Sequence, residues 1–126
     1  MIGRRYALPQ KTRAALERVF EAPLDQIIVI ENSLYARAHL GMCATTRPNR
    51  ILLAITGAQF AANPELLLHE YFHVIRQWRP GHLTRWRYLT ESVRRGYRAN
   101  RYEHEAREFA ATARERFERY LSELGQ

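Results

Sequence analysis

The chain is organised around one stretch, His69-Glu70-Tyr71-Phe72-His73. On an α-helix, residues four positions apart lie on one face, so His69 and His73 can present two imidazole nitrogens to a single cation. Glu70 lies one position round the helix and can reach a water molecule on that cation. The spacing therefore predicts a metal centre carried by a helix.

The residues around this stretch are those of a buried helix. Pro64 suits the first turn of a helix, and Glu65 complements the positive end of the helix dipole. Apolar side chains then surround the helix almost completely: Leu66, Leu67, Leu68, Tyr71, Phe72, Val74, Ile75 and Trp78. We expect this helix to lie in the middle of the fold.

Two imidazoles and a carboxylate on such an apolar helix need a physical explanation. Burying them without partners is costly, and a bound metal ion with its water would offset most of that cost. The simpler alternative is that His69 and His73 are core histidines and that Glu70 pairs with an arginine. All three residue types at this spacing favour the metal.

The length and composition indicate one globular domain. A chain of 126 residues can bury one core and is too short for two ordinary domains, so residues 1–126 are expected to form a single unit. No apolar run approaches the roughly 20 residues that span a bilayer, and no signal-peptide core follows the first residues. The single cysteine, Cys43, fits a reducing compartment. We expect a cytoplasmic protein without a membrane partner, and export as an effector stays open.

The charge of the chain raises the question of an acidic partner. The net charge is +7, and Lys11 is the only lysine among 20 basic residues. Arginines crowd residues 76–101 with tryptophans and tyrosines between them, a pattern typical of nucleic-acid surfaces. The alternative, which we favour, is a solvated helix face with the aromatic side chains turned inward. Nucleic-acid binding remains a second hypothesis.

The first half of the chain predicts one helix and a small sheet. A short amphipathic helix is expected over about residues 10–21, and residues 1–22 would act as a pro-segment or as a packing helix. Strands are expected over residues 26–30, 42–46 and 50–55, the last two joined as a hairpin at Arg47-Pro48-Asn49. Residues 32–41 follow neither helical nor strand periodicity.

The second half of the chain predicts three helices. Pro80-Gly81 should end the metal helix. A second helix is expected over about residues 83–95, with Leu83, Trp86, Leu89 and Val93 at helical spacing, and a third over about 101–124. The expected fold class is therefore α+β: an N-terminal helix, a mostly antiparallel sheet of about three strands, and then the metal helix and two further helices.

Two histidines leave a catalytic zinc ion one protein ligand short. The best place for a third is Tyr102-Glu103-His104-Glu105-Ala106-Arg107, at the start of the last helix. An H-E-x-x-H helix followed by an E-x-x-A helix resembles the gluzincin zinc metallopeptidases. Together with the preceding strands, residues of about 26–110 resemble the small peptidase-like core domain of extracellular contractile injection system proteins.

This resemblance implies a zincin-like fold and a role for each motif residue. His69 and His73 would bind Zn²⁺, Glu103 would be the third ligand, and Glu70 would be the general base in hydrolysis of a peptide bond. Glu105 is the alternative third ligand. The implied partner is a peptide or protein substrate.

One position departs from the family pattern. Arg107 stands where a carboxylate usually orients a ligand histidine, and Glu105 and Asn100 are the candidates to replace that carboxylate. The departure leaves open a second hypothesis, a peptidase-like domain with weak or no activity that serves as a structural or targeting part of a larger assembly. A basic protease acting on DNA-bound proteins is a third.

The resemblance also raises two questions about substrate handling. Tyr97, Tyr102 and Arg98 are candidates to stabilise a developing oxyanion. The strand at Arg50–Ile55 is a candidate to bind an extended substrate along its edge, with an ordinary core strand as the alternative.

Overall fold

The computed structural model describes residues 3–33, 44–96 and 100–125. Their fold is α+β, as the sequence predicts. The helices are α1 (Gln10–Phe20), α3 (Gly57–Ala61), α4 (Pro64–Phe72), the π-helix η1 (His73–Trp78), α5 (Arg85–Arg95) and α6 (Arg101–Leu124). The strands are β1 (Arg4–Tyr6), β2 (Ile28–Glu31), β3 (Ala44–Arg47) and β4 (Arg50–Leu53).

The described sheet has four strands in the order β1-β2-β4-β3. β1 pairs antiparallel with β2, β2 pairs parallel with β4, and β4 pairs antiparallel with β3. The β3–β4 pair is the predicted hairpin, and Asn49 in its turn adopts a positive φ of 57°. The sequence predicted about three strands. It missed β1 because Arg4-Arg5-Tyr6 shows no apolar alternation, and because the strand depends on its partner β2.

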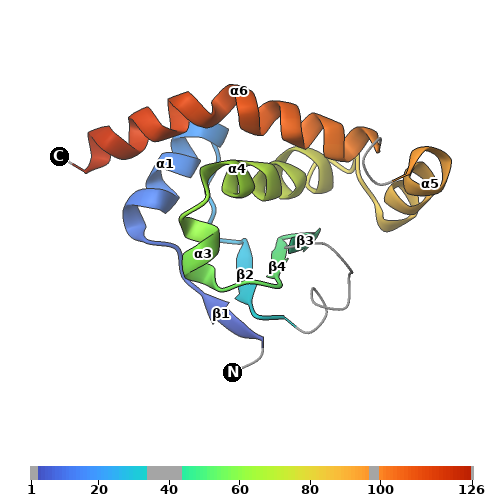
Figure 1. Ribbon diagram of the computed structural model, residues 1–126, viewed down its shortest axis with the longest axis horizontal. Coiled ribbons are helices and arrows are strands. Elements are labelled where there is room, and N and C mark those ends of the chain that lie inside the picture. The colour runs from blue at the N-terminus through green and yellow to red at the C-terminus, as the bar shows by residue number, and fades with distance from the viewer. Residues whose placement is uncertain (1–2, 34–43, 97–99, 126) are drawn as a thin grey trace.

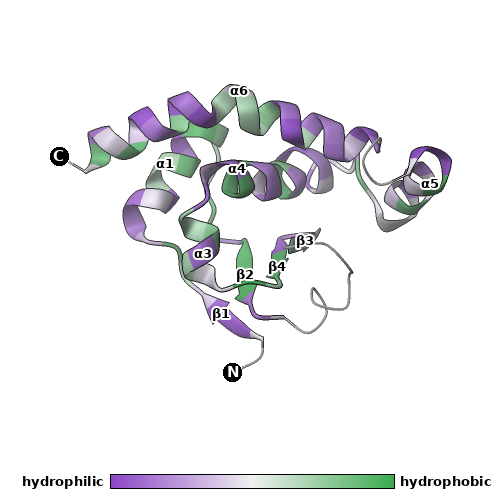
Figure 2. Cartoon of the chain, viewed as in Figure 1, coloured by the Kyte–Doolittle hydropathy of each residue, from purple (hydrophilic) through white to green (hydrophobic). Residues whose placement is uncertain are grey.

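The molecule is layered, with α4 between the sheet and α6 (Figure 1). Asn63 caps α4 by accepting a hydrogen bond from the Leu66 N–H, and Pro64 occupies the first turn, as predicted. Leu67, Leu68 and Tyr71 are buried. Figure 2 shows apolar residues gathered where α4, the sheet and the underside of α6 meet. Helix α4 therefore lies in the middle of the fold, as expected.

Helix α6 spans the length of the molecule and covers both α4 and α1 (Figure 1). Its apolar stripe recurs every three or four residues, and the buried members are Ala106, Ala110, Ala113 and Phe117. Small alanines let α6 approach α4 closely, and Phe117 fills space within the shared core. Helix α1 adds Leu16 and Phe20 to the same core.

The helix expected over residues 83–95 is present as α5, and two of the four apolar residues at helical spacing are exposed. Leu83 is buried just before α5, but Leu89 is 55% exposed and Val93 is 79% exposed, and the Trp86 side chain lies outside the described part. Polar groups of α5 face inward instead, because Glu91 and Ser92 find hydrogen-bond partners at the start of α6. The apolar spacing identified the helix but not its inner face.

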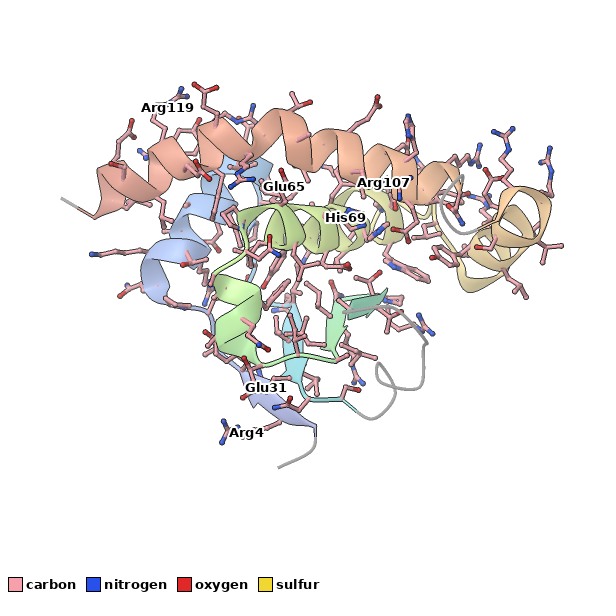
Figure 3. All side chains as sticks on the ribbon, in the orientation of Figure 1. Arg4, Glu31, Glu65, His69, Arg107 and Arg119 are labelled. Carbon is pink, nitrogen blue, oxygen red and sulfur yellow. The ribbon has the colours of Figure 1, made fainter. Side chains whose placement is uncertain are left out.

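The side chain of Glu31 on β2 links this strand to β1 and to the start of α3. One carboxylate oxygen accepts a hydrogen bond from the Gly57 N–H at 2.9 Å, and the other accepts two from Arg4 at 3.0 and 3.2 Å. Position 57 requires a glycine, because a Cβ there would overlap the Tyr6 ring. Figure 3 shows Arg4 and Glu31 well away from His69.

Within the described residues, none of the helices combines the length and apolar character that crossing a bilayer requires.

Candidate metal centre

Three elements supply the candidate site. His69 lies on the last turn of α4, His73 opens η1, and Glu103 lies on the first turn of α6. The Asn100 side chain caps α6 by accepting hydrogen bonds from the N–H groups of Tyr102 and Glu103. This cap fixes where α6 begins, and thereby places Glu103 opposite α4. In Figure 3, His69 lies on the side of α4 that faces α6.

The three side chains converge on one point. Glu103 Oε1 lies 2.9 Å from His69 Nε2 and 3.1 Å from His73 Nε2, and the two Nε2 atoms are 3.2 Å apart. The carboxylate and the His73 ring are buried, and the His69 side chain is 16% exposed. The structure thus brings Glu103, and not Glu105, to the two histidines.

These separations fit a bound metal ion. In a tetrahedral zinc site with bonds of about 2.0 Å, the donor atoms are separated by about 3.3 Å. The three measured distances lie close to that value, and the three residues form a group that could hold a metal ion. Two imidazoles and a carboxylate are also a donor set that zinc accepts. The identity of the metal is not fixed by this geometry.

Glu70 is the buried carboxylate beside this group. The residue is 6% exposed. No described arginine pairs with it, contrary to the metal-free alternative. Its charge interacts with His69, His73 and Glu103, so it faces the same space as they do. A buried carboxylate next to two histidines is placed to bind a water molecule of a metal-centred site.

The electrostatics of the site favour a cation. Burial raises the pKa of Glu70, and the charge of Glu103 adds to that rise, although the histidines oppose it. Burial lowers the pKa of His73, but the hydrogen bond and charge of Glu103 outweigh it and raise the pKa to about 9. For Glu103 burial raises the pKa and the two histidines lower it, with a net lowering. In the metal-free protein, a proton on His73 therefore compensates part of the negative charge that a divalent cation would neutralise.

Gln77 is a site residue that the sequence reasoning missed. Its Oε1 lies 2.6 Å from His73 Nδ1, and its Nε2 donates to the Tyr102 carbonyl at 3.0 Å and to Glu105 Oε1 at 2.9 Å. The side chain is buried within η1, a π-helix of the kind often found at functional sites. Its position four residues after His73 was the available signal.

Tyr88 is the second residue that was missed. Its hydroxyl donates to Glu103 Oε2 at 2.8 Å, so Glu103 is held from the side opposite the histidines. This hydroxyl comes from α5, which otherwise projects from the end of the molecule (Figure 1). No local pattern links residue 88 to residue 103, so only the fold could show the contact.

Other predicted site residues lie elsewhere. In the described part of the chain, neither Asn100 nor Glu105 has a hydrogen bond to His69 or His73: Asn100 caps α6, and Glu105 is linked to His73 through Gln77. The Tyr102 hydroxyl accepts a hydrogen bond from Arg101. Tyr97 and Arg98 lie outside the described residues, as does Cys43.

The strand predicted to bind substrate along its edge is not an edge strand. β4 lies between β2 and β3, with Ile51 and Leu53 fully buried, so the alternative of a core strand is correct. β3 stands at the end of the described sheet, next to η1. The Trp78 indole N–H donates to Thr46 Oγ1 at 3.0 Å and joins the two.

Comparison with known proteins identifies the family. No curated protein and no solved structure shows significant similarity to the chain. The sequence profile described as the eCIS core domain matches residues 7–81, which include both histidines, Glu70 and Gln77 but not Glu103. The match covers more than half of the chain. The chain therefore belongs to the eCIS core domain family.

Proposed function

We propose that this protein is a zinc-dependent peptidase in which His69, His73 and Glu103 hold the metal ion. The observation that carries the proposal is the convergence of His69 Nε2, His73 Nε2 and Glu103 Oε1 within 3.2 Å of one another, beside the buried carboxylate of Glu70. When bound, such an ion acidifies a water molecule and polarises the carbonyl that is attacked.

Other residues of the chain would supply proton transfer and hold the ligands in place. Glu70 takes a proton from the attacking water and returns it to the leaving amine, and its raised pKa makes it a stronger base than an ordinary glutamate. Tyr88 holds the orientation of Glu103.

The decisive experiment is Glu70→Gln, with Glu65→Gln as its control. Glu65 lies on the same helix but is exposed and pairs with Arg114. The amide keeps the shape of Glu70 but cannot take a proton, so we expect zinc binding close to that of the wild type and hydrolysis reduced by about 100-fold or more. Hydrolysis is measured as new termini in a mixed peptide library by mass spectrometry, and Glu65→Gln should match the wild type.

A second candidate function is a structural domain of a contractile injection system. Two observations favour it: the matching family is described as the eCIS core domain, and the exposed Arg107 replaces the expected supporting carboxylate. This function predicts that the zinc-loaded wild type cleaves no peptide in the library. Unchanged turnover in Glu70→Gln would instead show a peptidase whose base is another residue.

A further inference from the structure

Gln77 links the metal centre to the start of α6. Its side chain is 1% exposed and lies between η1 and α6. On one side it meets His73 Nδ1, and on the other it donates to the Tyr102 carbonyl and the Glu105 carboxylate. Every polar atom of this buried amide therefore has a partner.

The network leaves one orientation for the amide. Both partners on the α6 side are oxygen atoms that accept hydrogen bonds, so the group facing them must be the NH₂ group. Oε1 then faces His73 and can only accept, which requires a proton on His73 Nδ1. The lone pair of a neutral His73 is consequently on Nε2, the atom that lies 3.1 Å from Glu103 Oε1.

We propose that Gln77 is a positioning residue for the metal centre and that Glu105 acts on His73 through it. Glu105 fixes the orientation of the amide, and the amide fixes the tautomer and ring angle of His73. The inference rests on the proposed function, because it requires a metal ion at His73 Nε2. It also accounts for Arg107: in this chain the orienting carboxylate acts through a buried amide instead of directly.

A glutamine serves here better than a glutamate. Glu70 and Glu103 already place two carboxylates in the site. A third at position 77 would lie close to the charge of Glu105 and would leave the Tyr102 carbonyl without its donor. The neutral amide orients His73 without adding charge. Gln77 and Glu105 therefore have different roles, which variants at the two positions can test.

The test uses zinc affinity, measured by competition with a chromophoric chelator at pH 7. Gln77→Leu removes the acceptor, so we expect the affinity to fall by about 10- to 100-fold. Gln77→Glu alone should also lose affinity, because two carboxylates would face each other. Combining Gln77→Glu with Glu105→Gln replaces the facing carboxylate by an amide that can donate to residue 77. The Tyr102 carbonyl still lacks its donor, so the affinity should recover to about tenfold below the wild type.

A spectroscopic readout separates positioning from a merely structural role. In the zinc-loaded wild type, the His73 Nδ1–H should give a slowly exchanging signal in ¹⁵N-edited NMR. We expect Gln77→Leu to lose this signal and the paired exchange to regain it. Glu108→Gln, an exposed change one turn further along α6, should alter neither the signal nor the affinity.

The outcomes distinguish this inference from the proposed function. A wild-type protein that binds no zinc would overturn the proposed function itself. If the wild type binds zinc, the inference is overturned by a Gln77→Leu variant that keeps both wild-type affinity and the Nδ1–H signal. Should that variant fail to fold, the comparison of Gln77→Glu with the paired exchange decides, and equal affinity in the two would overturn the inference.

Discussion

At the scale of single residues, the site depends on where two glutamates fall in one helical turn. Glu103 and Glu105 are two positions apart, which is about 200° round an α-helix. The Asn100 cap sets the start of α6, so that Glu103 faces the histidines while Glu105 meets Gln77. The sequence could predict both candidates and prefer the first. It could not predict Gln77 or Tyr88, because their contacts cross between elements whose packing no local pattern encodes.

The contrast between these glutamates gives a prediction about metal binding. Glu103→Ala should weaken zinc affinity by orders of magnitude, because two imidazoles and water remain. Glu105→Ala should cost less than about tenfold, because it loosens only the support of one ligand. Chelator competition at fixed pH measures both. The ligand assignment is wrong if Glu105→Ala loses zinc while Glu103→Ala keeps it.

At the scale of elements, cap residues determine where helices begin, whereas tertiary partners determine which face of a helix is buried and whether a short strand forms. Asn63, Pro64 and Asn100 mark the starts of α4 and α6 in the sequence, and both helices begin there. The inner face of α5 carries polar groups with hydrogen-bond partners at the start of α6, a feature that its apolar spacing does not indicate. β1 was not predicted because it too depends on contacts between distant parts of the sequence. Its pairing with β2 is reinforced by Glu31, whose partners lie far away in the sequence.

Glu31 gives a prediction about acid stability. The Gly57 N–H and then Arg4 lower the pKa of Glu31 below its ordinary value of 4.5, so its ionised form stabilises the fold. That contribution is present above the unfolded-state pKa and is lost as the pH falls through the lower folded-state value. We expect Glu31→Gln to be less stable than the wild type at pH 7, and the difference to shrink below about pH 4.5.

Urea unfolding followed by circular dichroism between pH 3 and 7 measures this difference. Glu115→Gln, on an exposed position of α6, is the control and should show little change at any pH. A difference between Glu31→Gln and the wild type that stays constant down to pH 3 would show that the carboxylate charge is not what stabilises this corner of the fold.

At the scale of the whole molecule, the candidate centre joins parts of the chain that are held together in different ways. α1, α4 and the middle of α6 share the apolar core. Among the described residues, α5 and the first turn of α6 lie outside that core and make polar contacts, among them Tyr88–Glu103 and Gln77–Tyr102. A metal ion between η1 and α6 would therefore strengthen a part of the fold outside the apolar core.

This difference predicts a local response to metal. Adding zinc to chelator-treated protein should raise the melting temperature, since a ligand at about 1,000 times its Kd stabilises the native state by about 4 kcal/mol. Hydrogen exchange should slow in residues 69–77, 85–95 and 100–105, and should change little in β1 and β2. Glu103→Ala should abolish both effects, whereas Glu108→Gln should keep them. Uniform slowing of exchange across the chain would show that the metal ion stabilises the whole fold and not this region in particular. An unchanged melting temperature would contradict the metal centre itself.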